Sequence, residues 1–244
     1  GLKLTPPAPP VLNGNPGVRW ELLFADERGE EALARLTASA PKNVLSFVLA
    51  RPAAEFFPVE ELQSCVNAVV RRESDQVLML GPADGYPPLK EAILELLRRD
   101  GFNAKDENLL ITDGCQQSLD LICKGFVRPG DSVILENPTY PGALAIFHSA
   151  RARALGVPVR TQAEPGTTLG LDVEALETTL AANRVKLMVL TPDFHNPTGT
   201  SLPLASRRKV LEIASRHQVP IVEDHIYARL HSREERLPSL KQLD

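Results

Sequence analysis

Cysteine is scarce in this sequence, and its pattern excludes several kinds of site. The chain contains Cys65, Cys115 and Cys123, with no CxxC spacing and no histidine pair beside them. An odd count without such spacing argues against both a disulfide framework and a zinc site. The five histidines show no metal-ligand spacing either. We therefore expect reduced, partly buried thiols in a cytoplasmic protein and no metal centre.

Long hydrophobic runs and a surplus of positive charge are also missing. No apolar run approaches the roughly 18 residues that a membrane helix needs. The 27 Lys+Arg against 31 Asp+Glu give a formal net charge of −4, whereas a nucleic-acid-binding face needs a basic patch. With 43% hydrophobic and 24% charged residues, the composition is that of a soluble globular protein. We expect this chain to contact neither a membrane nor nucleic acid.

Proline is abundant at the start of the chain, at positions 6, 7, 9, 10 and 16. Prolines this dense lack backbone donors and cannot fill a helix or a sheet. Residues 1–43 are predicted to form a proline-rich linker or N-terminal arm; a disordered terminus and an arm that reaches another subunit both remain open. Because the chain begins with Gly1 rather than Met, we expect the natural protein to extend beyond these ends.

From Val59 onward the sequence predicts regular structure. Apolar residues at helical spacing predict helices over 59–72 and 88–99, after a short helix over 30–38. Strands are then predicted over 108–112, 132–136, 152–157, 185–190 and 219–222, and helices over 116–126, 142–150, 172–182 and 204–217. Continuous apolar strands alternating with helices predict an α/β fold of three α/β/α layers around a mostly parallel sheet. Ligands bind beyond the carboxyl ends of such strands.

The first two candidate sites follow predicted strands. Asp113-Gly114-Cys115-Gln116-Gln117 is a glycine turn that enters a helix, where free N–H groups favour an anion such as a phosphate. A tight turn without a ligand is at least as common. Asn137-Pro138-Thr139-Tyr140-Pro141-Gly142 holds a tyrosine between prolines. Such a ring is suited to stack on a flat ligand, and the alternative is a rigid surface turn.

Two further strand ends carry an amide and an acid. Asn196-Pro197-Thr198-Gly199 fixes an amide side chain, and Glu223-Asp224-His225-Ile226-Tyr227 places an acid after a buried strand. Burying an acid is costly unless a cation or a strong donor pairs with it, so we expect a charged partner for Asp224. A protonated ring nitrogen would serve. Together with the phosphate turn, these groups match the needs of a pyridine cofactor with a phosphate arm.

With these motifs in this order, the chain resembles the class I/II aminotransferases of pyridoxal-phosphate fold type I. It is most similar to the branch shared by free aminotransferases and by the effector domains of MocR-type regulators in the GntR family. The similarity runs from Leu45 to Asp244 and includes Gly85-Tyr86-Pro87-Pro88-Leu89-Lys90 as well as the motifs above. It implies that residues 44–244 form the N-terminal part of the pyridoxal-phosphate-binding large domain, without the small C-terminal domain.

The resemblance implies a role for each candidate residue. Asp224 would pair with the protonated pyridine nitrogen, and Asn196 and Tyr227 would hydrogen-bond the 3-oxygen of the ring. Tyr140 would stack on the ring face. The backbone N–H groups of the phosphate turn would hold the phosphate; its residues are Gly114, Cys115 and Gln116.

The lysine that forms a Schiff base with the cofactor in this family lies in a Ser-x-Ser-Lys motif, which this sequence does not contain. The only lysine after Tyr227 is Lys241, which we expect to stay on the surface. We therefore expect no catalytic residue in this chain, a truncation before the lysine, and no activity from the chain alone.

Three hypotheses about function follow. The intact protein is a homodimeric aminotransferase acting on an amino acid and a 2-oxo acid, or a regulator whose DNA-binding domain is not in this chain. The proline-rich start favours the regulator. The third hypothesis is a fragment that has the fold but binds no cofactor.

Overall fold

The computed structural model describes residues 52–105, 108–162, 168–230 and 236–244, and residues 53–244 form one compact unit. The predicted arm over 1–43 and the predicted helix over 30–38 lie outside the described residues. The domain boundary at residue 44 therefore stays a prediction.

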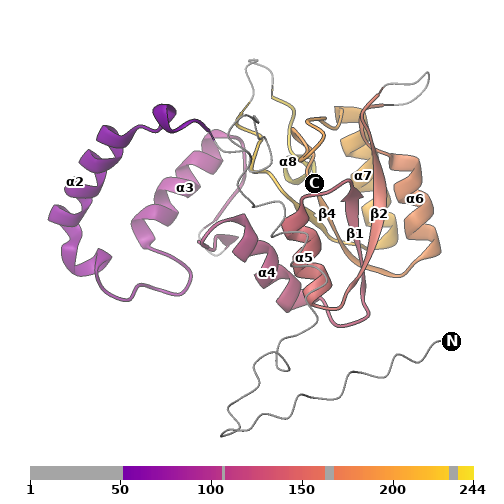
Figure 1. The fold of residues 1–244 in the computed structure, drawn as a ribbon, viewed down its shortest axis with the longest axis horizontal. Helices are drawn as coiled ribbons and strands as arrows, with labels where there is room; N and C mark the ends of the chain where they lie inside the picture. Colours follow the sequence, from indigo (N-terminus) through magenta and orange to yellow (C-terminus); the bar gives the residue numbers. More distant parts are fainter. Residues whose placement is uncertain (1–51, 106–107, 163–167, 231–235) are drawn as a thin grey trace, which may run out of the picture. The chain divides into compact units, whose positions relative to one another are not determined.

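The unit is built on a five-stranded sheet with the order β3-β2-β1-β4-β5 (Figure 1). Its strands are β1 (Ser132–Asn137), β2 (Arg153–Arg160), β3 (Gly170–Leu171), β4 (Val185–Leu190) and β5 (Ile221–Glu223). β1 pairs in parallel with β2 and β4, and β4 pairs in parallel with β5, whereas β3 is antiparallel to β2. The prediction of a mostly parallel sheet is confirmed, and the carboxyl ends of β1, β4 and β5 share one edge.

Helices cover both faces of the sheet (Figure 1). α4 (Cys115–Phe126) and α5 (Pro141–Ser149) lie on one face, and α6 (Val173–Ala182) and α7 (Leu204–His217) on the other. Because side chains alternate along a strand, Val133 and Leu135 pack toward α4 and α5, while Ile134 packs toward α6 and α7. This two-sided burial explains why the strand sequences are continuously apolar.

Two further helices come before α4 in the chain: α2 (Val59–Val77) and α3 (Pro87–Arg99). Pro87 and Pro88 suit the first turn of α3, where the missing N–H groups would have no helical partner. Between α2 and α3, Gly85 has a φ of +117°, and a Cβ there would lie 2.3 Å from Cγ1 of Ile111. Only glycine allows this approach, which joins the start of α3 to the segment before α4.

One predicted strand is wrong. Residues 108–112 form no strand, because none of the described strands pairs with them. The amide of Ile111 donates instead to the carbonyl of Asp84 at 3.1 Å, and the Leu110 side chain is 53% exposed. An apolar sequence alone cannot make a strand without a neighbour to complete its hydrogen bonds.

The predicted boundaries of the other elements agree with the structure to within a few residues. β3, the 3₁₀ turn Ala54–Phe56 and α8 (Leu240–Leu243) were not predicted. In the described ranges we find no helix with the length and hydrophobicity that crossing a bilayer requires.

Candidate cofactor site

The phosphate turn lies at the N-terminus of α4. Gly114 is the N-cap residue, with a φ of 88°, and it has no side chain to accept the N–H groups of the first turn. A Cβ at Gly114 would meet nothing within 4 Å, so the space beside the turn is open. Open N–H groups at a helix N-terminus carry partial positive charge and suit an anion. The phosphate site itself stays a prediction, at a turn whose N–H groups no N-cap side chain occupies.

Gln116, in the first turn of α4, contacts the loop after β1. The Tyr140 hydroxyl donates to Oε1 of Gln116 at 3.2 Å, and Nε2 of Gln116 donates to the carbonyl of Gly142 at 3.4 Å. A Cβ at Gly142 would lie 2.5 Å from ring atoms of Tyr140. The absence of a side chain at Gly142 therefore sets where the Tyr140 ring lies. No role was predicted for Gly142 from the sequence.

Asn196 and Tyr227 lie side by side although they follow different strands. Nδ2 of Asn196 donates to the Tyr227 hydroxyl at 3.3 Å. Both side chains are half-buried. The amide and the phenol expected to share one ligand oxygen are thus brought together by β4 and β5.

Asp224 lies directly after β5, and its amide donates to the carbonyl of Leu190 at 2.8 Å. Its Oδ1 accepts from the backbone amide of Ile226 at 3.2 Å, and its Oδ2 lies 3.7 Å from Sγ of Cys115. Among the described residues, no lysine, arginine or histidine forms an ion pair with Asp224. The charged partner that we expected is therefore not supplied by the described side chains, which fits a carboxylate placed for a cationic ligand atom.

The electrostatics show that these side chains form one cluster. Burial raises the pKa of Tyr140 above its usual range, and the charges of Cys115, Tyr227 and Asp224 raise it further. Burial likewise raises the pKa of the Cys115 thiol to about 11, with a contribution from the negative charge of Asp224. The phenol and the thiol are therefore both protonated at neutral pH.

A buried arginine anchors the loop that carries Asn196. Arg207, on α7, is fully buried and pairs with both carboxylate oxygens of Asp193, at 2.5 and 3.2 Å. It also donates to the carbonyls of Pro192 and Leu202, at the two ends of the loop. This ion pair was not predicted from the sequence. Its only signal was a charged residue on the apolar face of a predicted helix.

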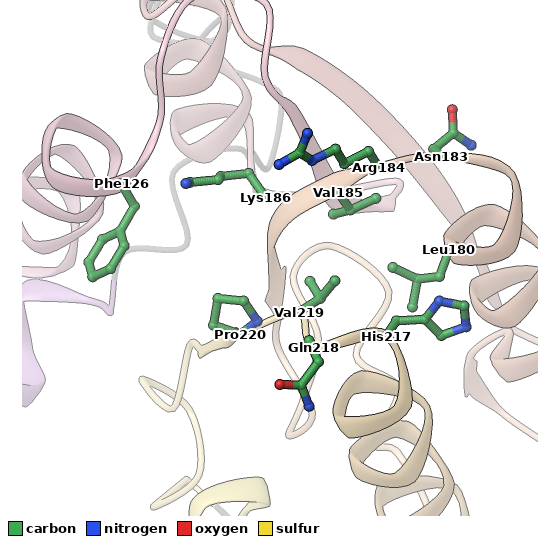
Figure 2. Close-up of a pocket in the computed structure, with 10 residues that line it drawn as sticks. All are labelled: Phe126, Leu180, Asn183, Arg184, Val185, Lys186, His217, Gln218, Val219 and Pro220. Carbon is green, nitrogen blue, oxygen red and sulfur yellow. The ribbon is translucent and has the colours of Figure 1, made fainter.

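A cavity of about 410 Å³ lies at the opposite edge of the sheet, at the amino ends of β4 and β5 (Figure 2). Figure 2 shows the side chains of Arg184 and Lys186 extending to one side, and that of His217 to the other. These polar groups do not converge on one point, and the cavity contains none of the predicted site residues.

The family profile described as "Aminotransferase class I and II" matches residues 54–242. The chain belongs to the class I and II aminotransferase family. In sequence, the chain is 36% identical over 201 residues to the 2-aminoadipate transaminase of Thermus thermophilus, covering 82% of the chain and 48% of that protein. It is also 29% identical over 201 residues to the uncharacterized HTH-type transcriptional regulator YjiR of Escherichia coli, covering 82% of the chain and 42% of that protein.

The fold of the chain is similar to that of a solved enzyme. The α-aminoadipate aminotransferase LysN of Thermus thermophilus, complexed with N-(5'-phosphopyridoxyl)-L-leucine, superposes with a TM-score of 0.77 at 35% identity. The match covers 93% of this chain and 55% of LysN. The chain thus spans about half the length of the relatives that it matches.

Proposed function

We propose that the intact protein is a pyridoxal-phosphate-dependent aminotransferase, which moves an amino group between an amino acid and a 2-oxo acid. One observation carries the proposal. The Asp224 carboxylate, which has no cationic partner among the described side chains, lies in one cluster with Tyr140, Tyr227 and the open N-terminus of α4. The comparisons support the same function, because relatives of similar sequence and fold are named aminotransferases.

Each residue of the cluster has a defined task in this proposal. The Asp224 carboxylate holds the proton of the pyridine nitrogen, and Asn196 and Tyr227 donate hydrogen bonds to the 3-oxygen. Tyr140 covers one face of the ring and excludes water from it. The N–H groups that begin α4 bind the phosphate. When bound, the protonated pyridine ring supplies an electron sink for the negative charge that develops on the substrate.

The test is transamination by the intact protein. Purified protein with pyridoxal phosphate is offered a panel of amino acids with 2-oxoglutarate, and the new 2-oxo acids are measured. We expect turnover of at least one amino acid, and a loss of at least about 100-fold in kcat for Asp224→Asn, because the amide cannot hold the ring proton as a carboxylate does. If the protein binds the cofactor but turns over no amino acid, the proposed aminotransferase activity is refuted.

A second candidate function is supported by the HTH-type regulators among the relatives, YjiR of Escherichia coli and YdfD of Bacillus subtilis. In that case the domain is an effector domain, and occupancy of its cofactor site controls DNA binding. The gene upstream of Gly1 decides the matter: a winged-helix domain there favours the regulator, and a gene without one excludes it. A protein that binds no cofactor at all would leave the third hypothesis, a fold without a cofactor.

We further propose that the intact protein is a homodimer in the cytoplasm. Val59, Leu62, Val66 and Val70 repeat at helical spacing along α2, and each is at least 39% exposed. Such an apolar face favours burial against another surface. The free thiols of Cys65, Cys115 and Cys123 support a reducing compartment. Light scattering should give the mass of a dimer; a monomeric intact protein would contradict the proposal.

A further inference from the structure

The residue before Asn196 is a buried histidine that the proposed function does not use. His195 is 2% exposed, although it lies in the loop after β4. Its Nδ1 is 2.8 Å from Oγ1 of Thr198, within the same loop. Its Nε2 is buried, makes no hydrogen bond to the described residues and lies 3.3 Å from Oε2 of Glu136. The ring thus lies between its own loop and a carboxylate on another strand.

Glu136 belongs to β1 and is 5% exposed. Its Oε2 accepts from the backbone amide of Thr191 at 2.8 Å, the first residue after β4. Among the described residues, His195 is the basic side chain that the structure pairs with it. A carboxylate this buried is costly without polar partners, so the hydrogen bond from the Thr191 amide stabilises it, and the His195 ring adds a close polar contact at 3.3 Å. Glu136 therefore ties β1 to both the start and the interior of the loop.

The loop closes tightly around His195. Its amide donates to the carbonyl of Thr200 at 2.8 Å, and its carbonyl accepts from the amide of Gly199 at 2.6 Å. The hydroxyls of Thr198 and Thr200 are 2.8 Å apart. These bonds constrain the backbone on both sides of Asn196, whose side chain points to Tyr227 at the candidate cofactor site.

We propose that His195 is a positioning residue: its ring joins Glu136 on β1 to Thr198 and thereby holds the Asn196 amide where it meets the 3-oxygen of the cofactor. The inference rests on the proposed function, since it assigns Asn196 a ligand. It extends that function to a residue that touches neither cofactor nor substrate. The alternative is a histidine that only fills space under the loop.

Three substitutions at position 195 separate these alternatives in the intact protein. His195→Leu fills the space without polar atoms. His195→Asn keeps a polar atom near the position of Nδ1, toward Thr198, and His195→Gln keeps one near the position of Nε2, toward Glu136. Val210→Ala is the control, because Val210 is fully buried on α7 and its truncation costs stability without removing any of the polar contacts described for His195.

The main readout is the pH dependence of the visible absorption band of bound pyridoxal phosphate, with the dissociation constant from a fluorescence titration. A hydrogen bond to the ionised 3-oxygen lowers its pKa, so a misplaced Asn196 raises the midpoint of the titration. We expect His195→Leu to raise the midpoint by about one pH unit and to weaken binding about tenfold, the effect of one lost hydrogen bond. His195→Asn or His195→Gln should recover part of both.

An unchanged midpoint in His195→Leu would overturn the inference, as would an equal shift in Val210→Ala. If the unaltered protein binds no pyridoxal phosphate, the proposed function fails, and crystal structures of the unaltered and His195→Leu proteins then decide the inference. Loss of the 3.3 Å contact between Nδ2 of Asn196 and the Tyr227 hydroxyl in the variant supports positioning by His195. Retention of that contact overturns it.

Discussion

The raised pKa of Cys115 gives a prediction that tests the site geometry without any cofactor. The thiol pKa rises from 9.0 to about 11, because the side chain is half-buried and lies 3.7 Å from the Asp224 carboxylate. Two pH units leave about 100-fold less thiolate at neutral pH. A thiolate of higher pKa is a stronger nucleophile, and with a Brønsted coefficient of about 0.45 this recovers about eightfold. The net expectation is a reaction roughly tenfold slower than that of an ordinary cysteine.

The assay is alkylation of the cofactor-free intact protein by iodoacetamide, followed site by site by mass spectrometry. A small peptide thiol serves as the reference, and Cys65, which is exposed, reports that the reagent reaches the protein. The Cys115 rate should keep rising about tenfold per pH unit beyond pH 9, where an ordinary thiol levels off. Asp224→Asn removes the neighbouring negative charge and should accelerate the reaction. A Cys115 that reacts as fast as the peptide, or a rate that Asp224→Asn leaves unchanged, would refute the predicted proximity.

Three further predictions concern single residues in the intact protein. Gly142→Ala should weaken pyridoxal phosphate binding about fivefold in a fluorescence titration, because the new methyl group displaces the Tyr140 ring and the lost ring stacking costs about 1 kcal/mol. Gly125→Ala is the control, because a Cβ at Gly125 meets nothing within 4 Å. Equal affinities of Gly142→Ala and the unaltered protein would contradict this prediction. Asp172 caps α6 and pairs with Arg160; burial would raise its pKa, but the guanidinium and the first-turn amides lower it overall. Ionised Asp172 therefore adds stability above its usual pKa that is lost as the pH falls through its lowered one. Asp172→Ala should lower the free energy of unfolding in urea by about 1 kcal/mol or more at pH 7. Asp172→Asn should lower it less, because asparagine keeps the N-cap hydrogen bonds. An equal loss in both variants would show that the N-cap is irrelevant. Arg207→Met should lower the free energy of unfolding by about 3–5 kcal/mol, because it leaves Asp193 buried without its cation. Adding Asp193→Asn should recover part of that loss. A loss below about 1 kcal/mol in Arg207→Met alone would contradict the prediction.

Hydrophobic pattern predicted most of the fold. The predicted strand over 185–190 and helix over 204–217 have the bounds of β4 and α7, because their apolar residues recur at the period of the element that they form. The segment 108–112 has the same apolar character, yet it forms no strand. Whether such a segment pairs depends on a neighbour distant in the sequence, and local pattern carries no information about that neighbour.

The candidate site, like the fold, could be predicted from the sequence only in part. Polar residues at strand ends could be recognised along the sequence, and Asn196 and Tyr227 do meet in the structure. The supporting residues could not be recognised, because their roles come from contacts between distant elements. The sequence does not distinguish such residues from ordinary charged or titratable ones. They form two pairs in the structure: His195 with Glu136, and Arg207 with Asp193.

The most direct test of the central claim is the affinity of the intact protein for pyridoxal phosphate, measured by absorption titration beside the Asp224→Asn variant. If the strand ends form the cofactor site, the unaltered protein binds and the substitution weakens binding by about 10- to 100-fold, the range for a charge-assisted hydrogen bond. No binding by the unaltered protein, or the same affinity in Asp224→Asn, would contradict it.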